Sequence, residues 1–161
     1  MRKLFVLRHG KASKNFDYSE DFKRNLNKKG IAQINQIGYI LRESGVKIDE
    51  IISSKARRTF ETAQIANHYL NCSNVSFNED LYLCSYNTIA AALDNSSDAI
   101  TRLYVGHNNG ISDFVNWLCE ENMLLNTGML VEIDLEINDW GELSQGIGKI
   151  VNITKPDVLS F

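Results

Sequence analysis

Two of the three histidines in this sequence of 161 residues stand where they could act on the same chemical group. His9 follows the apolar run 4–7 in the segment LRHGK, and His107 follows the run 103–105 in the segment GHNNG. Both runs are short and apolar, which is typical of parallel strands that are buried on both faces. The carboxyl ends of parallel strands lie at one edge of a sheet, so we expect the two imidazoles to lie close together.

Basic side chains accompany the two histidines. Arg8 and Lys11 flank His9, and a further apolar run leads through two serines into a helical pattern that carries Arg57 and Arg58. Guanidinium groups match phosphate oxygens in bidentate geometry, and the start of a helix adds backbone N–H donors. A neutral imidazole is a nucleophile toward phosphorus, and surrounding cations lower its pKa and keep it unprotonated. The pattern therefore indicates phosphoryl transfer, in which negative charge spreads over three oxygens of the transferred group.

The elements that would position these residues alternate between strand and helix patterns. We expect strands over residues 4–7, 49–53, 102–106, 129–137 and 147–153, of which 129–137 alternates like a half-exposed antiparallel edge strand. We expect helices over 26–41, 56–70, 88–94 and 111–118, with Gly45 as a helix stop and Phe60 on the face that meets the sheet. This alternation implies a three-layer α/β/α sandwich with a mainly parallel central sheet and an antiparallel C-terminal edge. No linker or repeat divides the chain, so we expect a single domain over residues 1–161.

Three segments of the sequence resemble the signature of a known enzyme family. The segment RHG around His9, the segment SSKARRTFETA over 53–63 and the segment GHN over 106–108 are similar to the three blocks of the histidine phosphatase superfamily. They come in the family's order, and Thr127-Gly128 and Trp140 extend the resemblance over nearly the whole chain. The resemblance implies a phosphoglycerate mutase-like fold. The short length, the start RHGKA and the pair Leu81-Tyr82 resemble the SixA-like phosphohistidine phosphatases.

The resemblance also implies roles for individual residues. His9 would be the nucleophile that becomes phosphorylated, and Arg8, Arg58 and His107 would hold the phosphoryl group. Arg58, rather than Arg57, takes the phosphate-binding position of the second block. That block departs from the family pattern elsewhere, because it has KARRTFE over residues 55–61 where the family usually has PxxRAxQ.

Two further contacts and the general acid are less marked in the sequence. Lys11 and Asn108 are candidate substrate-binding residues at the rim of the site. Mutase-type relatives supply a glutamate from the middle of the chain, and Glu79 is the candidate acid here, although it stands in no clear motif. A phosphohistidine substrate would not require this acid, because imidazole is a better leaving group than an alkoxide.

Composition argues against several other classes of protein. The formal net charge of −3 and the pI of about 5.6 argue against a nucleic-acid binder, and no apolar run approaches the roughly 20 residues that cross a bilayer. Cys72, Cys84 and Cys119 form no CxxC pair, so we expect reduced thiols in a cytoplasmic protein. We expect no metal or other cofactor, because arginines at the sheet edge would repel a cation. Nothing in the sequence demands more than a monomer.

Three functional hypotheses follow from the site and the resemblance. The first is a metal-independent phosphatase that removes phosphate from phosphohistidine on a protein, such as a histidine phosphotransfer domain. A chain of this length leaves little for insertions that roof the site, and an open site suits a phosphoryl group on a protein surface. The second is a phosphatase for small phosphomonoesters or nucleotide derivatives. The third is a non-catalytic phosphate-binding module, which would be expected to lose His9 or an arginine.

Overall fold

Alternate side chains of the first strand enter two different hydrophobic cores. In β1 (Arg2–Arg8), Leu4 and Val6 belong to one core, whereas Phe5 and Leu7 belong to the other. A strand that is buried on both faces requires a layer of helices on each side.

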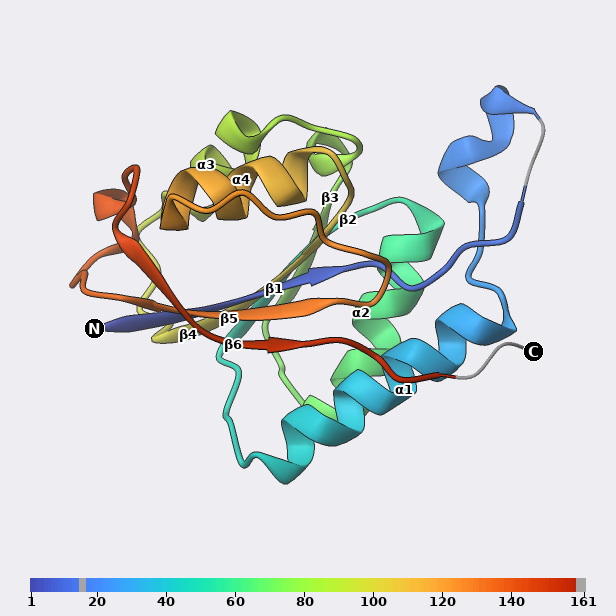
Figure 1. Ribbon diagram of the computed structural model, residues 1–161, viewed down its shortest axis with the longest axis horizontal. Helices are drawn as coiled ribbons and strands as arrows, with labels where there is room; N and C mark the ends of the chain where they lie inside the picture. The colour runs from blue at the N-terminus through green and yellow to red at the C-terminus, as the bar shows by residue number, and fades with distance from the viewer. Residues whose placement is uncertain (15–16, 159–161) are drawn as a thin grey trace.

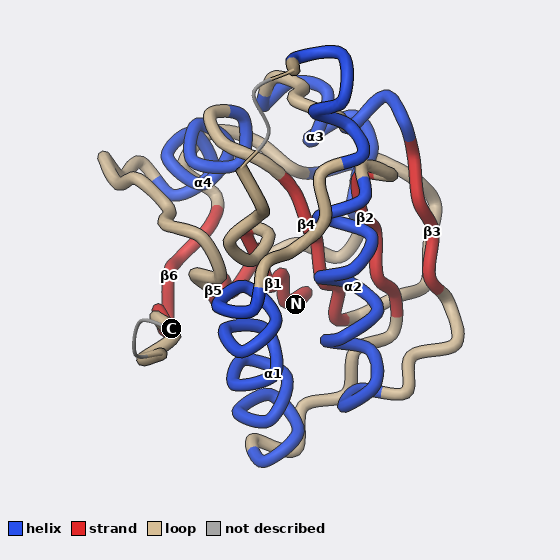
Figure 2. Tube along the Cα trace, turned by 90° about the vertical axis from the view of Figure 1, so that its right-hand side faces the viewer, coloured by secondary structure: helices blue, strands red, loops and turns tan. Residues whose placement is uncertain are grey.

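Helices cover both faces of the sheet in the computed structural model, which describes residues 1–14 and 17–158 (Figure 1). One layer consists of α1 (Lys28–Glu43) and α2 (Arg57–Leu70), which lie side by side (Figure 2). The other layer consists of α3 (Tyr86–Leu93) and α4 (Gly110–Cys119). The predicted three-layer sandwich is therefore confirmed.

The sheet has the strand order β3-β2-β4-β1-β5-β6. The further strands are β2 (Glu50–Ser54), β3 (Val75–Asn78), β4 (Thr101–Gly106), β5 (Leu130–Leu135) and β6 (Gly148–Thr154). β1, β2, β3 and β4 run parallel, whereas β5 runs antiparallel to β1 and to β6. The loops contain the 3-10 helices η1 (Tyr18–Lys23), η2 (Glu79–Leu81) and η3 (Trp140–Glu142). The carboxyl ends of the parallel strands consequently share one edge of the sheet.

All predicted strands and helices are present, with ends that shift by a few residues. α1 ends at Glu43, and Gly45 follows it with a φ of 74°, which is the left-handed conformation that stops a helix. The sequence does not predict β3, because its four residues, VSFN, are too few for an alternating pattern to stand out.

The prediction that 129–137 forms the edge strand is wrong. β5 lies inside the sheet between β1 and β6, and β6 is the outer, largely exposed strand. The polar positions of β5 are Glu132 and Asp134, whose carboxylates lie 2.5 and 2.8 Å from Nζ of Lys3 on β1. Their alternation therefore reflects a cross-strand ion pair rather than an open edge.

Phe60 also departs from the predicted core face of α2. Ala63 and Ala66 on that face are buried, whereas Phe60 is half-buried and its ring packs against Phe77 of β3, with centroids 4.7 Å apart. β3 is the edge strand, so a side chain in the first turn of α2 reaches the margin of the sheet instead of its centre.

Two glycines fix the segment that follows β1. Gly128 has a φ of 74°, and its backbone N–H donates to the carbonyl oxygens of Arg8 at 3.1 Å and His9 at 3.0 Å. A Cβ atom on Gly10 would lie 2.7 Å from the carbonyl oxygen of Gly30 in α1. Neither position accepts a side chain without displacement, so the loop that carries His9 is held from two sides.

Three simple properties of the described part of the chain complete the fold. None of its helices is long and apolar enough to span a lipid bilayer. The three cysteines carry free thiols. No group of three His, Cys, Asp or Glu within residues 1–14 and 17–158 is arranged to hold a metal ion.

Candidate active site

The pairing of β1 with β4 brings His9 and His107 together. Arg8 lies opposite Gly106 in the parallel register, and the backbone N–H of His9 donates to the Gly106 carbonyl at 3.2 Å. The two imidazole centroids are 5.3 Å apart, and the residues are only 7% and 3% exposed. The structure thus brings together the two histidines that the strand pattern singled out.

The connection between β2 and α2 adds a further wall and separates Arg58 from Arg57. Arg58 is 3% exposed, whereas the Arg57 side chain is 59% exposed and lies 3.6 Å from the Glu61 carboxylate. Adjacent residues on a helix point about 100° apart, which is why only one of the two arginines faces inward. At the end of β2, Oγ of Ser54 lies 2.8 Å from Nε2 of His107.

Asp21 of η1 holds Arg58 in place. Arg58 donates from Nη1 to the Asp21 carbonyl at 2.8 Å and from Nη2 to Oδ2 at 3.2 Å. The Tyr82 hydroxyl donates to the same carboxylate oxygen, and Arg24 donates from Nη1 to Oδ1 at 3.0 Å. Partial burial alone would raise the pKa of Asp21, but the hydrogen bonds from Tyr82 and Arg24 and the charge of Arg58 lower it to about 2. Asp21 is therefore a carboxylate anchor for two arginines.

Sequence reasoning missed Asp21 and Arg24, and it noted Tyr82 only as part of a family pair. Residues 17–25 carry no apolar periodicity and therefore resemble a polar loop. The signal that could have found them is the opposite charges of Asp21 and Arg24 three residues apart, which suits one helical turn.

The backbone carbonyl of Leu125 positions two other candidate residues. Arg8 donates to it from Nη1 at 2.9 Å, and Asn108 donates to it from Nδ2 at 2.8 Å. Ser112 donates from Oγ to Oδ1 of Asn108 at 2.5 Å and accepts from the Leu125 N–H at 2.9 Å. Asn108 borders the pocket with both ends of its amide already bonded, so its main contact is to the neighbouring loop.

These residues surround a pocket of about 360 Å³, which we call the His9 pocket. The candidate residues His9, His107, Arg8, Arg58, Lys11 and Asn108 all line it. So do Lys14 and Arg24, together with Ala12, Leu83 and Thr127. No aspartate or glutamate is among its described lining residues, so the pocket presents five cationic side chains and suits an anion.

Glu79 is the one predicted site residue that the structure leaves outside the pocket. Its side chain is 71% exposed and lies 3.7 Å from the ammonium group of Lys55. It is not among the lining residues of the His9 pocket, so the structure does not bring it to His9.

Both histidines are neutral in the folded protein. Burial lowers the pKa of His9 to about 3, and the charges of Arg58 and Arg8 add to this effect. Burial likewise lowers the pKa of His107 to about 2, with contributions from His9 and Arg58. His9 has Nδ1 2.7 Å from the carbonyl of Gly10, which can only accept, so Nδ1 carries the proton and Nε2 carries the lone pair.

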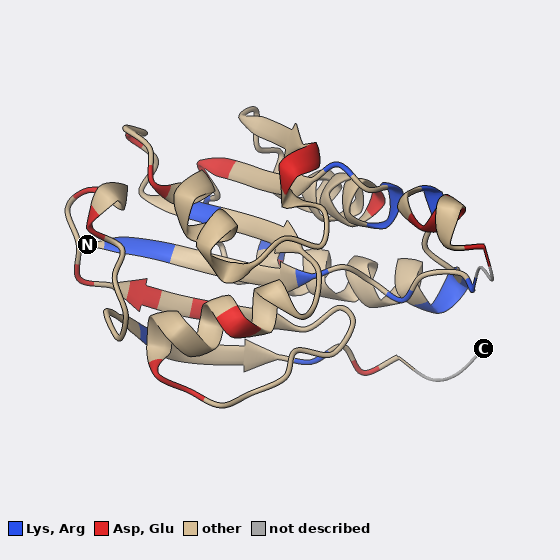
Figure 3. Ribbon diagram, turned by 90° about the horizontal axis from the view of Figure 1, so that it is seen from above, with Lys and Arg blue, Asp and Glu red and all other residues tan. Residues whose placement is uncertain are grey.

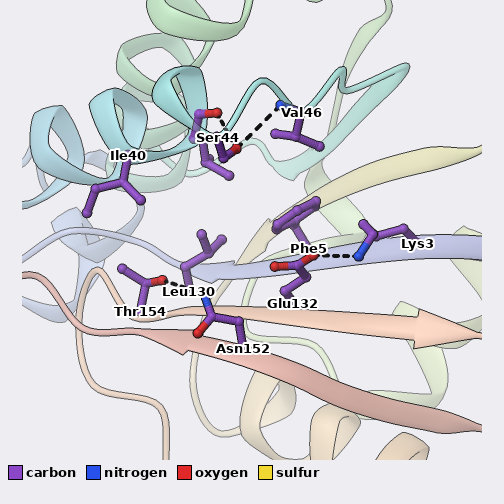
Figure 4. A pocket seen from close by; sticks show the side chains of 10 residues that line it. Lys3, Phe5, Ile40, Ser44, Val46, Leu130, Glu132, Asn152 and Thr154 are labelled. Atoms are coloured by element: carbon purple, nitrogen blue, oxygen red, sulfur yellow. Dashed lines mark hydrogen bonds and ion pairs between the residues drawn. The ribbon is translucent and has the colours of Figure 1, made fainter.

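A separate, smaller hollow of about 170 Å³ lies between α1 and the strands β1, β5 and β6 (Figure 4). Lys3 and Glu132 form an ion pair in it, and Ile40 and Leu41 of α1 close one side. It contains none of the candidate residues and shares no lining residue with the His9 pocket.

Comparison with known proteins places the chain in a family. Residues 4–92, more than half of the sequence, match the model of the histidine phosphatase superfamily (branch 1). The protein therefore belongs to this superfamily. A search of curated proteins found no match.

Solved structures share the fold over nearly the whole chain. A candidate phosphohistidine phosphatase SixA from Agrobacterium tumefaciens is 20% identical with a TM-score of 0.84, and the match covers 96% of this chain and 98% of that one. A protein histidine phosphatase SixA in complex with tungstate is 22% identical with a TM-score of 0.79, over 96% and 97% of the two chains. A phosphoglycerate mutase from Plasmodium falciparum is 19% identical with a TM-score of 0.67, over 99% and 94%. The protein thus has the phosphoglycerate mutase-like α/β fold.

The two buried neutral histidines should make stability fall below pH 6.5. Their pKa values drop from 6.5 to about 3 and about 2 on folding, so the unfolded chain binds protons that the folded chain does not. The contribution of the two neutral histidines to the free energy of unfolding is fully present above pH 6.5. Below this pH, each histidine lowers that free energy by roughly 1.4 kcal/mol per pH unit until the pH reaches its pKa in the folded protein. The free energy of unfolding, measured by urea denaturation between pH 7 and 4, should fall less steeply with decreasing pH for His107→Asn than for the wild type. The exposed His68→Asn is the matched control, and equal slopes for wild type and His107→Asn would contradict the assignment.

Asp21→Asn should weaken the fold but strengthen anion binding. Arg58 and Arg24 lose a charged acceptor, which costs about 1.5–3 kcal/mol of unfolding free energy. The removed negative charge lies beside the pocket, so orthophosphate should bind roughly tenfold more tightly, since such a charge contributes more than 1 kcal/mol at an effective dielectric constant of about 20. Thermal melting and calorimetric titration measure the two effects. Glu20→Gln is the control, because this half-exposed carboxylate pairs only loosely with Lys23 at 3.7 Å. Weaker orthophosphate binding by Asp21→Asn would refute the account.

Proposed function

We propose that this protein is a phosphatase that takes the phosphoryl group from phosphohistidine on a protein and forms a phosphohistidine intermediate on His9. A histidine phosphotransfer domain is the kind of substrate that we expect. The observation that carries the proposal is the state of His9, a neutral imidazole in a pocket of cations, with Nδ1 bonded to Gly10 and the Nε2 lone pair free.

The tautomer of His9 suits both halves of the reaction. In the first half, Nε2 attacks phosphorus of a substrate phosphohistidine that already carries a proton on its other ring nitrogen. The P–N bond of the substrate breaks, and its imidazole leaves as a neutral group. In the second half, water attacks phosphorus and the bond between phosphorus and Nε2 breaks. The two water protons leave with the released phosphate, and His9 leaves as a neutral imidazole because Nδ1 has kept its proton against the Gly10 carbonyl. Neither leaving group has to acquire a proton at the nitrogen that breaks from phosphorus.

His107 is suited to donate a hydrogen bond to the phosphoryl group. Oγ of Ser54 lies 2.8 Å from Nε2 of His107, and we infer that the Ser54 hydroxyl donates to this nitrogen. His107 then carries its proton on Nδ1, a buried atom without a partner among the described residues. Arg8 Nε is a second buried donor without a partner there. A phosphoryl oxygen would satisfy such donors, since buried polar groups are normally hydrogen-bonded.

The choice of phosphohistidine over a phosphate ester rests on the available acids. The described lining of the His9 pocket has no carboxyl group, Asp21 is bonded to Arg58, and Glu79 lies outside. An alkoxide leaving group needs a proton donor, whereas a phosphorylated imidazole does not. The shared fold with SixA structures agrees with this choice. A small phosphomonoester or nucleotide derivative is the alternative substrate, and a role in phosphate binding alone is disfavoured because His9, Arg8 and Arg58 are all present.

A substrate panel tests the proposed function. Wild-type protein should release phosphate from a phosphorylated histidine phosphotransfer domain and from phosphoimidazole faster than from any phosphate monoester. His9→Ala should abolish both activities without lowering the melting temperature, and millimolar vanadate should inhibit the wild type. Activity should survive excess EDTA, since arginines supply the positive charge. Faster turnover of monoesters, or near-normal activity of His9→Ala, would overturn the proposal.

Arg58 and Arg57 form a matched pair for testing the phosphate contact. Arg58→Ala should lower kcat/KM on phosphoimidazole by an amount that corresponds to about 2–4 kcal/mol, or roughly 30- to 1000-fold, as for other donors that stabilise transition-state charge. Arg58→Lys should recover only part of this loss, because an ammonium group cannot replace the guanidinium fork. Arg57→Ala should change this small-substrate activity little, since its side chain faces solvent. A larger loss in Arg57→Ala would refute the placement of these residues.

A further inference from the structure

A second hollow adjoins the His9 pocket on the other side of residues 22–24. It has a volume of about 570 Å³. Its lining residues come from η1, from the connection between β2 and α2, and from α2: Phe22, Lys23, Lys55, Arg57, Phe60, Glu61 and Gln64. We call it the Phe22–Phe60 groove. Arg24, the next residue after Phe22 and Lys23, lines the His9 pocket, so the two hollows share one wall.

Two aromatic rings give this groove an apolar surface. Phe22 and Phe60 are both half-buried, although the spacing of apolar residues in α2 predicts that Phe60 lies in the core. The ring of Phe22 packs edge-on against Tyr82 with centroids 5.0 Å apart, and Tyr82 in turn lies beneath the Arg58 guanidinium at 5.7 Å. Partly exposed aromatic side chains beside arginine are enriched at sites that bind other proteins.

The charge around the two hollows identifies the kind of partner. Segments 8–29 and 55–64 contain ten of the 17 Lys and Arg residues but only four of the 20 Asp and Glu residues. Lys and Arg gather at the end of the molecule opposite the N-terminus, as Figure 3 shows. The rest of the chain is acidic, so this face stands out as the basic one. A partner that binds here by complementary charge must present carboxylates.

We propose that the Phe22–Phe60 groove is the docking surface for the phosphorylated protein substrate. The groove takes one large apolar side chain, flanked by carboxylates, from the substrate surface beside its phosphohistidine. This inference rests on the proposed function and adds the contact that distinguishes a protein substrate from a small one. Because Phe22 packs on Tyr82, a docked partner also contacts the residue that supports Tyr82 beneath Arg58.

Comparison of a protein substrate with phosphoimidazole distinguishes an effect on docking from an effect on the phosphoryl-transfer reaction. Lys23→Glu and Phe60→Gln should each lower kcat/KM for the phosphorylated phosphotransfer domain by roughly tenfold or more, as expected for central contacts of an interface. Both variants should hydrolyse phosphoimidazole at the wild-type rate, because neither residue lines the His9 pocket. Lys149→Glu, the same charge reversal at an exposed site on β6, is the matched control and should leave both activities unchanged. Melting temperatures show that each variant is folded, and Lys23→Glu keeps the test valid if Phe60→Gln is unstable.

Other outcomes would overturn the docking proposal. Equal losses on both substrates would mean that the groove only supports the His9 pocket. Unchanged activity on both substrates would mean that the groove has no part in substrate binding. Self-association or binding to anionic vesicles that Lys23→Glu abolishes, with protein turnover unchanged, would assign the groove to another occupant. Failure of the wild type to hydrolyse either the phosphorylated phosphotransfer domain or phosphoimidazole overturns the proposed function instead. In that case, affinity of His9→Ala for the phosphorylated domain, with and without Lys23→Glu, still decides whether the groove binds it.

Discussion

The parallel pairing of β1 with β4 is the constraint on which the site depends. It places Arg8 opposite Gly106 and thereby sets the next residues, His9 and His107, side by side. A shift of one residue in this register would turn one of the imidazoles to the opposite face of the sheet. The two hydrophobic cores on either side of β1 oppose such a shift, because they require Leu4 and Val6 on one face and the intervening apolar residues on the other. Packing far from the pocket thus fixes its chemistry.

The pocket also has to hold like charges together. Arg8, Arg24 and Arg58 line one small pocket, and their mutual repulsion must be compensated when no anion is bound. The Asp21 carboxylate compensates the charges of Arg24 and Arg58, which both donate hydrogen bonds to it. The backbone carbonyl of Leu125 accepts a hydrogen bond from Arg8. The carboxylate lies behind Arg58 rather than among the residues that line the pocket. The guanidinium groups are therefore oriented in advance, which is the condition for stabilising charge that develops during a reaction.

The sequence predicts much of this arrangement because its signals are local. Apolar runs mark the central strands, and the residues that follow them mark the site. Adjacent residues on a helix point about 100° apart, so the sequence predicts that only one of Arg57 and Arg58 faces the site. The contacts of Asp21 with Arg58 and Tyr82 could not be found in this way, since these partners are distant in sequence and only the folded chain brings them together. Apolar spacing misplaces Phe60 because it does not encode the position of a helix relative to the sheet margin. It misses β3 because four residues are too few for an alternating pattern to stand out.

The two ends of the chain lie differently with respect to the site. β1 runs toward His9, so the amino terminus emerges at the opposite end of the sheet (Figure 1). The C-terminal segment returns to the site, where Pro156 lies close to Gly128 and the Asp157 N–H donates to the Gln36 side chain at 2.7 Å. Gly128 in turn donates to the carbonyl of His9. Attachment of the protein to a bead or sensor through its amino terminus therefore leaves the loop that carries His9 free of mechanical load, whereas attachment through the carboxyl terminus pulls on the turn that supports this loop.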